Sequence, residues 1–546
     1  MKDYKKEYRN FSLTVPQRFS FPLDVFDRWG KRIALFWTDG DNEEKLSFDQ
    51  LKILSSKGAT FFKKLGIKKG DKVLVMLPNI PEWWEVMLAL MRVNAIPIPA
   101  TTLLTPRDIR YRLSATDIKA VIATDEDIPK VEDGVNGIYP LLVIINTTIP
   151  SLVKGREARF YGKNHGWYNY REERDKADIF QGERISSDEP ALIYFTSGTT
   201  GPPKMVFHTQ ASYPFAHQIT GKFWLDLRPG DIFWNLSDTG WAKAAWSSLF
   251  GPWHMGATVF SFSKKGRFDP SQTTEIIQRY PITVFCGPPT AYRMMVKELP
   301  AQRFTFKSIR HFVAAGEPLN KEIIEVWRER TGRYIYDGYG QSETINVLAN
   351  FRCLRVKPGS MGVPVPGFIV DIIDNNGKPV SPGIEGDIAI RIKPERPVGL
   401  FKEYLGNPEA TARTMKLEWY ITGDRAYKDE DGYFCFIGRA DDIILTSGYR
   451  IGPFEIESIL IEHHAVEESA VVASPDDIRG EVVKAFVVLT EGFKPSDALV
   501  EELQEFVKKQ TAPYKYPRKI EFVNELPKTI SGKIKRKELK IKEFTK

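Results

Sequence analysis

Cysteine is scarce in this chain, which has 546 residues and only Cys286, Cys353 and Cys435. No two of them have the CxxC spacing, which argues against a zinc site or a disulfide framework and favours a reducing compartment. The chain also lacks an apolar run long enough to cross a membrane, and no apolar stretch follows the charged start MKDYKKEYRNF. These absences predict a cytoplasmic protein with no secretory signal and no membrane span.

A strong charge of one sign is also missing, because the net charge of +7 is spread along the chain. The basic cluster near the C-terminus, within 533–540, is interrupted by acidic residues, and no RNA- or DNA-binding module is recognisable. A solvated surface, or attraction for a small polyanion, is therefore favoured over nucleic acid. The length alone predicts two or more domains.

A rhythm of strand and helix signals fills the first quarter of the chain. KVLVMLP (72–78) is typical of a strand, PEWWEVMLALMRVNA (81–95) of a helix that begins at proline, and IPIPA (96–100) of a short strand. The same alternation continues to about residue 125. It predicts βαβ units and a parallel sheet, whereas the less periodic segment 126–185 is interpreted as peripheral.

The most distinctive stretch is YFTSGTTGPPK, residues 194–204. An apolar strand leads into hydroxyls and glycines, and Lys204 closes the loop. Glycines let backbone N–H groups surround an anion, while hydroxyls and a lysine add donors and positive charge. The loop therefore suits a polyphosphate, but it is not a Walker A loop, because Pro203 stands where GxxxxGK needs its second glycine.

Three later segments also read as strands that end in glycine-bearing loops: 284–290, 311–320 and 334–344. Ligands bind at the carboxyl ends of strands in open parallel sheets, so these loops are expected to share one site. The Trp-rich segment 235–260 is most simply a core helix. Short strands over 357–391 predict a small β-barrel. From 441 the pattern indicates a small α+β unit with a polar loop, 527–536, near its end.

These motifs and their order resemble the adenylate-forming superfamily, most closely the medium-chain acyl-CoA synthetases. The resemblance covers nearly the whole chain. It implies an α/β fold with a large N-terminal domain (1–440) of βαβ units and a small β-barrel, followed by a mobile α+β C-terminal domain (441–546).

The resemblance also implies roles for individual residues. Lys533 in PKTISGKIKR, Glu343 and Lys204 would be catalytic, with Glu343 also binding Mg²⁺, a hard cation that prefers carboxylate oxygen. ATP or AMP would be bound by Thr196, Ser197, Gly198, Thr199, Thr200, Gly201, Gly316, Glu317, Pro318, Asp337, Gly338, Tyr339, Gly340, Gln341, Ser342, Asp424, Ile437 and Arg439. Among these, Tyr339 would stack on adenine and Asp424 would accept the ribose hydroxyls.

The acyl group and CoA would lie nearby. Trp234, Trp241, Trp246, Gly287 and Gly340 are expected to wall an apolar acyl pocket, in which Gly340 leaves volume for acids of medium size. Ser447, Gly448, Tyr449 and Arg450 are expected to contact CoA, and Asp441 is the expected hinge between the two domains.

The implied reaction joins a carboxylic acid to CoA through an acyl-adenylate, with ATP and Mg²⁺ as further partners. An adenylation enzyme that loads a carrier protein, a luciferase-like oxidase and a non-catalytic nucleotide sensor are the alternatives. A sensor would be expected to lack Lys533 or Glu343, and both are present. The sequence leaves open the acid, the direction of the reaction and the oligomeric state, for which a homodimer is one option.

Overall fold

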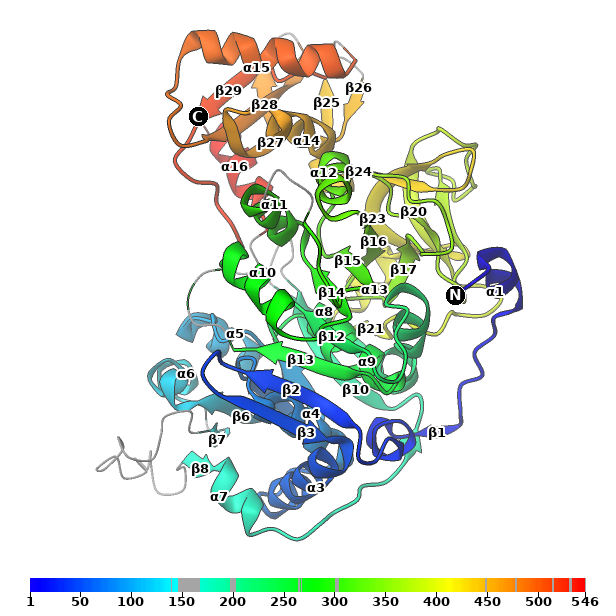
Figure 1. Ribbon diagram of the computed structural model, residues 1–546, viewed down its shortest axis with the longest axis vertical. Coiled ribbons are helices and arrows are strands. Elements are labelled where there is room, and N and C mark those ends of the chain that lie inside the picture. The colour runs from blue at the N-terminus through cyan, green and yellow to red at the C-terminus, as the bar shows by residue number, and fades with distance from the viewer. Residues whose placement is uncertain are drawn as a thin grey trace.

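The computed structural model describes residues 1–138, 140–145, 167–196, 203–263, 266, 268–299, 304–446, 449–476, 479–512, 515–529 and 533–545. Figure 1 shows a large lower part, coloured blue to yellow, and a smaller C-terminal unit, orange to red, at the top of the molecule. Within these ranges, no helix combines the length and the apolar character that crossing a bilayer demands.

A nine-stranded sheet forms the centre of the large part. Its six inner strands are parallel, and antiparallel strands close both edges. In spatial order the strands are β18 (Val363–Pro364), β17 (Asn346–Ala349), β16 (Ile335–Gly340), β15 (His311–Ala315), β14 (Val284–Gly287), β12 (Ile232–Asn235), β13 (Thr258–Phe262), β2 (Ile33–Thr38) and β3 (Glu43–Ser47). The strands predicted at the start of 284–290, 311–320 and 334–344 are confirmed.

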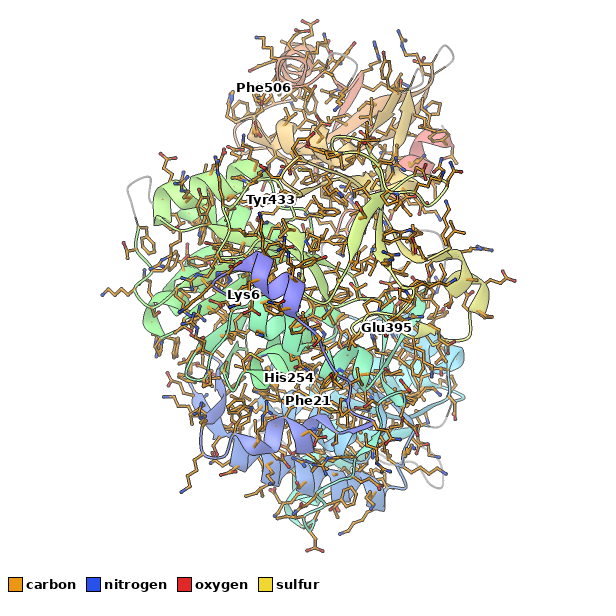
Figure 2. All side chains as sticks on the ribbon, turned by 90° about the vertical axis from the view of Figure 1, so that its right-hand side faces the viewer. Lys6, Phe21, His254, Glu395, Tyr433 and Phe506 are labelled. Atoms are coloured by element: carbon orange, nitrogen blue, oxygen red, sulfur yellow. The ribbon has the colours of Figure 1, made fainter. Side chains whose placement is uncertain are left out.

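Helices cover both faces of this sheet, so each strand buries alternate residues in opposite cores. Phe233 and Val284 belong to one core, while Trp234 and Phe285 belong to the other, which includes Trp327. In Figure 2 the first core is marked by Phe21, which packs edge-on against His254 with 5.4 Å between ring centroids.

The α-helices of the large part are α1 (Tyr4–Asn10), α2 (Phe21–Asp24), α3 (Phe48–Lys64), α4 (Pro81–Arg92), α5 (Pro106–Ala115), α6 (Ile128–Val135), α7 (Tyr170–Asp175), α8 (Ala242–Ala245), α9 (Gly251–His254), α10 (Pro270–Arg279), α11 (Pro289–Glu298), α12 (Lys321–Thr331) and α13 (Pro408–Arg413).

A second sheet of five parallel strands lies in the blue and cyan part of Figure 1. Its order is β5 (Ile96–Pro99), β4 (Lys72–Met76), β6 (Ile118–Thr124), β7 (Leu141–Ile145) and β8 (Trp167–Asn169). The predicted alternation of strand and helix over 72–100 is confirmed by β4, α4 and β5. The peripheral interpretation of 126–185 is wrong for β7, β8 and α7, because β7 and β8 extend the sheet. In α7, buried Tyr170 donates its hydroxyl to Glu85 at 2.7 Å.

Two antiparallel arrangements flank these sheets. β10 (Pro190–Thr196) and β11 (Lys204–Thr209) form a hairpin that continues into β21 (Glu403–Tyr404), and a pair joins β1 (Arg18–Phe19) to β9 (Ile185–Ser186). The region 357–391, predicted to form a small barrel, supplies β19 (Val370–Ile373) and β20 (Gly386–Arg391), which pair with later strands in the order β19, β20, β23 (Trp419–Lys428) and β22 (Met415–Lys416), with β24 (Phe434–Arg439) also paired to β23. No strand pairing among the described residues closes these strands into a ring, so the region is an antiparallel sheet instead of a barrel.

The C-terminal unit has its own sheet and its own apolar cores. Its elements are β25 (Ile444–Thr446), β26 (Tyr449–Ile451), α14 (Pro453–Glu462), β27 (Val466–Asp476), β28 (Gly480–Leu489), α15 (Asp497–Gln510), β29 (Lys519–Phe522) and α16 (Arg536–Phe544). These elements confirm the small α+β unit that was predicted from residue 441. α16 was missed, because its apolar residues are few and lysines surround them.

Candidate active site

The carboxyl ends of β14, β15 and β16 lie at one edge of the central sheet. Gly287 pairs with Ala314, and Ala315 pairs with Gly338, so the loops after these strands begin side by side, as predicted. Gly316 turns the chain away from β15 with a φ of 108°, which side chains of L-residues rarely adopt. The turn places Glu317 where it accepts a hydrogen bond from Thr290 at 2.9 Å.

The carboxylate of Asp424 is the centre of a buried polar network above this edge. It is 4% exposed, and its Oδ2 accepts hydrogen bonds from the Tyr339 hydroxyl and from Gln341 Nε2, each at 2.6 Å. Its Oδ1 accepts from Arg439 at 3.0 Å. Burial lowers the pKa of Arg439, but Asp424, Tyr339 and Glu343 reverse that effect, and the net shift is upward. The network holds the Asp424 carboxyl group and the Arg439 guanidinium against each other in a fixed place.

A second cluster joins Glu343 to the β10–β11 hairpin, named here the phosphate hairpin, at the residues that flank its turn. Lys204 pairs with Thr196 across the hairpin, and its Nζ lies 4.7 Å from the centre of the Tyr404 ring. The Tyr404 hydroxyl donates to Glu343 Oε1 at 2.7 Å. Oε2 of Glu343 takes no hydrogen bond from any residue that the structure describes, so this oxygen is available for a cation. The remaining predicted loop residues, Ser197 to Gly201, lie outside the described residues.

His208 fixes the backbone of the loop that carries Glu343. Its Nε2 lies 2.7 Å from the carbonyl oxygen of Ser342. Because a carbonyl oxygen only accepts hydrogen bonds, Nε2 carries the proton and donates it, which fixes the tautomer of the ring. Burial lowers the pKa of His208 to about 3, so the ring is neutral at neutral pH. Sequence reasoning missed this residue.

Lys243 is the second residue that the sequence did not reveal. It lies on α8, and its Nζ donates to the carbonyl oxygen of Ala315 at 2.9 Å. Burial raises the pKa of Asp337 to about 8, and Lys243 acts against that shift. Lys243 also lowers the pKa of Cys286, which burial raises. Lys243 therefore places a positive charge at the carboxyl ends of three central strands.

The predicted acyl pocket does not assemble as a single wall. Trp234 is 2% exposed and packs in the core that contains Phe260 and Phe285, on the opposite face of the sheet from Trp246. The reason is the two-residue period of β12, which directs Phe233 and Trp234 to opposite faces. Trp241, before α8, is only partly buried. Gly287 lies beside Tyr292 and Phe285, where a Cβ would be 3.2 Å and 3.3 Å from their rings.

Gly340 does not leave an empty volume, contrary to the prediction. A Cβ at this position would be 2.4 Å from the carbonyl oxygen of Ile345 and 2.8 Å from the Trp246 ring. The Trp246 side chain thus takes the place next to Gly340 that a substrate was expected to fill. Of the predicted acyl residues, the structure brings together Trp246 and Gly340.

The predicted residues of the C-terminal region lie along the connection to the smaller unit. Ile437 lies within β24 and Arg439 ends it, and exposed Asp441 lies in the following 3₁₀ turn, Ala440–Asp442. Tyr449 is half exposed at the start of β26. The side chain of Arg450, like Ser447 and Gly448, lies outside the described residues. Lys533 is exposed in the hairpin that precedes α16.

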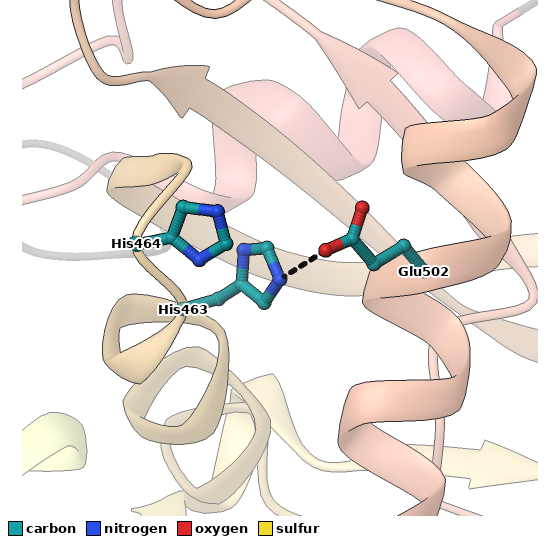
Figure 3. Close-up of side chains that lie close together, drawn as sticks. All are labelled: His463, His464 and Glu502. Atoms are coloured by element: carbon teal, nitrogen blue, oxygen red, sulfur yellow. Dashed lines mark hydrogen bonds and ion pairs between the residues drawn. The ribbon is translucent and has the colours of Figure 1, made fainter.

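The described part of the chain has one group of His and Glu side chains whose ligand atoms all lie within 4.8 Å of one another: His463, His464 and Glu502. Figure 3 shows His463 joined to Glu502, with Nε2 3.1 Å from the carboxylate. Nδ1 of His463 accepts the N–H of Ala465 at 3.3 Å, so the proton is on Nε2. A metal ion on Nε2 would move that proton to Nδ1, against the Ala465 N–H. We therefore assign this group to helix packing between α14 and α15.

Comparison with known proteins identifies the family. The model of the AMP-binding enzyme family matches residues 24–405, and the model of the AMP-binding enzyme C-terminal domain matches residues 455–533. The mouse protein named acyl-coenzyme A synthetase ACSM3, mitochondrial, is 48% identical over 99% of this chain and 93% of its own length. Human acyl-coenzyme A synthetase ACSM4, mitochondrial, is 48% identical over 97% and 91%.

Solved structures agree in fold over nearly the whole length. An acyl-CoA synthetase from Brucella canis is 32% identical, with a TM-score of 0.75 over 100% of this chain and 99% of that one. The anthranilate CoA ligase AuaEII in complex with anthranoyl-AMP is 28% identical, with a TM-score of 0.85 over 97% and 98%. A benzoate CoA ligase from Burkholderia xenovorans is also 28% identical, with a TM-score of 0.82 over 96% and 100%.

The comparisons overturn the expected compartment. The chain was predicted to be cytoplasmic, but the similar mouse, rat, orangutan and human proteins are all named as mitochondrial. That prediction is therefore wrong. Its basis, the scarcity of cysteine and the lack of a secretory signal, fits other reducing compartments equally well.

Proposed function

Since the chain belongs to the AMP-binding enzyme family, we propose that it is an AMP-forming acyl-CoA synthetase for a medium-chain, branched, cyclic or aryl carboxylic acid. The observation that carries the proposal is the similarity to acyl-coenzyme A synthetases along the whole chain. The site supports it, because the phosphate hairpin, Glu343 and the Asp424 network converge at the edge where the central strands end.

Each part of the site has a role in the first half-reaction. The carboxylate oxygen of the acid attacks the α-phosphorus of ATP, the bond to the bridging oxygen breaks, and pyrophosphate leaves. Residues 196–204 hold the β- and γ-phosphates, and the Asp424 network faces the ribose. We assign Gly316, Glu317, Pro318 and Tyr339 to the binding of adenine. Lys533 stabilises the charge that builds on the α-phosphate.

Glu343 fits a magnesium ion, because its Oε2 takes no hydrogen bond from the described residues and a carboxylate oxygen is the ligand that Mg²⁺ prefers. When bound, the ion would neutralise phosphate charge. The Tyr404 hydroxyl orients Glu343 through the other oxygen at 2.7 Å. His208 holds the backbone of Ser342 and thereby the direction of the Glu343 side chain.

In the second half-reaction, the CoA thiol attacks the acyl carbonyl, the thiol proton is lost, and AMP leaves. We assign residues 1–440 to the nucleotide and acyl domain and 441–546 to a domain that turns about Asp441. The separate apolar cores of the C-terminal unit support this division. Turning withdraws Lys533 and presents Ser447, Gly448, Tyr449 and Arg450 to CoA.

The function is tested by acid-dependent exchange of labelled pyrophosphate into ATP, across straight, branched, cyclic and aryl acids, followed by thioester formation with CoA. An acyl-CoA synthetase gives both activities. Exchange without CoA thioester, together with loading of a pantetheinyl carrier, would identify a carrier-loading enzyme instead. Nucleotide binding with no exchange for any acid would identify a sensor.

Lys243→Met is expected to lower kcat/KM for the acid by about 10- to 100-fold, the usual effect of losing a hydrogen bond from a charged group. The variant removes the positive charge beside Ala315 and Asp337, where the anionic substrate approaches. The measurement is pyrophosphate exchange against acid concentration. Lys307→Met, an exposed lysine before β15, is the matched control. Equal kcat/KM in the variant and the wild type would remove Lys243 from the site.

Trp246→Ala is expected to raise the preference for a ten-carbon over a four-carbon acid by about tenfold or more, since each newly buried CH₂ contributes up to about 0.8 kcal/mol. The indole ring lies against Gly340, so its removal opens space at the predicted acyl site. Trp234→Ala removes the same volume from the opposite face of the sheet and is expected to leave the preference unchanged. For each variant we compare kcat/KM for the ten-carbon acid with kcat/KM for the four-carbon acid. Both variants lose stability, and a smaller amount of folded enzyme lowers both values equally, so it does not change their ratio. A similar shift in both variants contradicts the assignment of Trp246.

A further inference from the structure

Arg536, the first residue of α16, follows Lys533 by three positions and ties three elements together. Its Nε and one terminal nitrogen donate to the two carboxylate oxygens of Glu457 on α14, at 2.8 and 2.5 Å. The backbone N–H of Val471 on β27 donates to the same carboxylate at 2.8 Å. A bidentate pair of this kind fixes direction as well as distance. The start of α16 is therefore held rigidly against the C-terminal unit.

The hairpin that carries Lys533 is built directly on this anchor. Lys535 N–H donates to the carbonyl oxygen of Pro527 at 2.8 Å, and Thr529 N–H donates to the carbonyl oxygen of Lys533 at 2.7 Å. Lys533 N–H donates in turn to the Thr529 hydroxyl at 3.1 Å. Because Arg536 is the next residue after the base of this hairpin, a shift of Arg536 moves Lys533 with it.

The remaining nitrogen of Arg536 faces the connection between the two domains. It lies 3.9 Å from Oδ2 of Asp442, the last residue of the turn that contains Asp441. Burial raises the pKa of Asp442, and the charges of Arg536 and Arg439 oppose that shift. Arg439 is itself bound to Asp424 at 3.0 Å. Charges of alternating sign thus run from the nucleotide site to α14: Asp424, Arg439, Asp442, Arg536 and Glu457.

We propose that Arg536 is a positioning residue for Lys533: its ion pair with Asp442 joins the domain connection to the lysine hairpin, so that the connection sets where Lys533 stands during adenylation. This inference rests on the proposed function. Glu457 fixes Arg536 within the C-terminal unit, and Asp442 couples Arg536 to Arg439 on the other side of Asp441. When the Asp442 contact is lost, α16 stays folded, but the hairpin that carries Lys533 is no longer held at the nucleotide site.

The test uses the full chain and measures both half-reactions. Asp442→Asn is the first variant, because its partly exposed side chain can lose its charge without a buried partner being stranded. It is expected to lower kcat for pyrophosphate exchange about tenfold, since a displacement of about 1 Å costs up to about 100-fold. Thioester formation from supplied acyl-adenylate and CoA is expected to stay within about twofold.

Arg536→Lys keeps the charge but loses the bidentate bond, and it is expected to show the same split between the half-reactions. Combined with Asp442→Asn, it should add less than its separate effect, because both changes act through the position of the same side chain at residue 536. Lys537→Met, an exposed neighbour on the same helix, is the matched control. The inference is overturned if neither variant changes exchange, if both half-reactions fall together in a folded variant, or if the two effects multiply. Absence of exchange in the wild type would instead refute the proposed function.

Discussion

Lys533→Ala is expected to lower acid-dependent pyrophosphate exchange by about 100- to 1,000-fold, the range found when one preorganised charge-stabilising donor is removed from an active site. The second half-reaction needs no such charge, because AMP leaves from an adenylate that is already formed. Conversion of supplied acyl-adenylate and CoA into thioester is therefore expected to continue at close to the rate of the wild type.

Lys537→Ala is the control for Lys533→Ala, since it removes a positive charge four residues further along the chain from an exposed position on α16. Thermal unfolding of both variants shows whether the C-terminal unit remains folded. An equal fall of both half-reactions in a folded Lys533→Ala protein would contradict a lysine that acts only in the adenylating conformation.

The backbone of the site could be predicted from the sequence because it depends on local patterns. One apolar run of strand length ended at Gly316, and another ended in the residues after Tyr339. Neighbouring parallel strands end at the same edge of a sheet, so the loops that follow them lie together. Glu343, which follows β16, and Asp424, which lies in β23 of the antiparallel sheet, were found because a motif surrounds each of them. Their partners lie far away in sequence, as Tyr404 lies 61 residues from Glu343.

The errors have a common physical cause, which is that sequence does not give side-chain direction across the fold. Trp234 and Trp246 both looked suitable for an acyl wall, yet the period of β12 sends Trp234 to the other core. Gly340 was interpreted as space, whereas the Trp246 ring and the Ile345 carbonyl are close to it. Lys243 was passed over because a lysine in a Trp-rich segment gives no sign that its ammonium reaches Ala315.

Asp441→Pro is expected to have the opposite effect to Lys533→Ala: pyrophosphate exchange is retained and thioester formation is lost. Asp441 is the second residue of the 3₁₀ turn Ala440–Asp442. Residues in such a turn have φ near the value that proline imposes, and the first N–H groups of a helical turn have no intrahelical partner. Proline therefore fits the conformation described here, apart from a small cost at Ala440, which precedes it.

A second domain orientation requires different backbone angles at the hinge, and a fixed φ at residue 441 resists that change. Asp441→Pro should retain pyrophosphate exchange within about threefold and lose thioester formation from supplied acyl-adenylate by about 100-fold, the usual size of an effect that blocks a required geometry. Asp441→Ala removes the same side chain without restricting φ and is expected to support both half-reactions. If Asp441→Pro turns over as fast as Asp441→Ala, the domain rotates about another residue. If instead exchange is lost and thioester formation survives, proline has trapped the thioester-forming orientation, and the conformation described here is not the adenylating one.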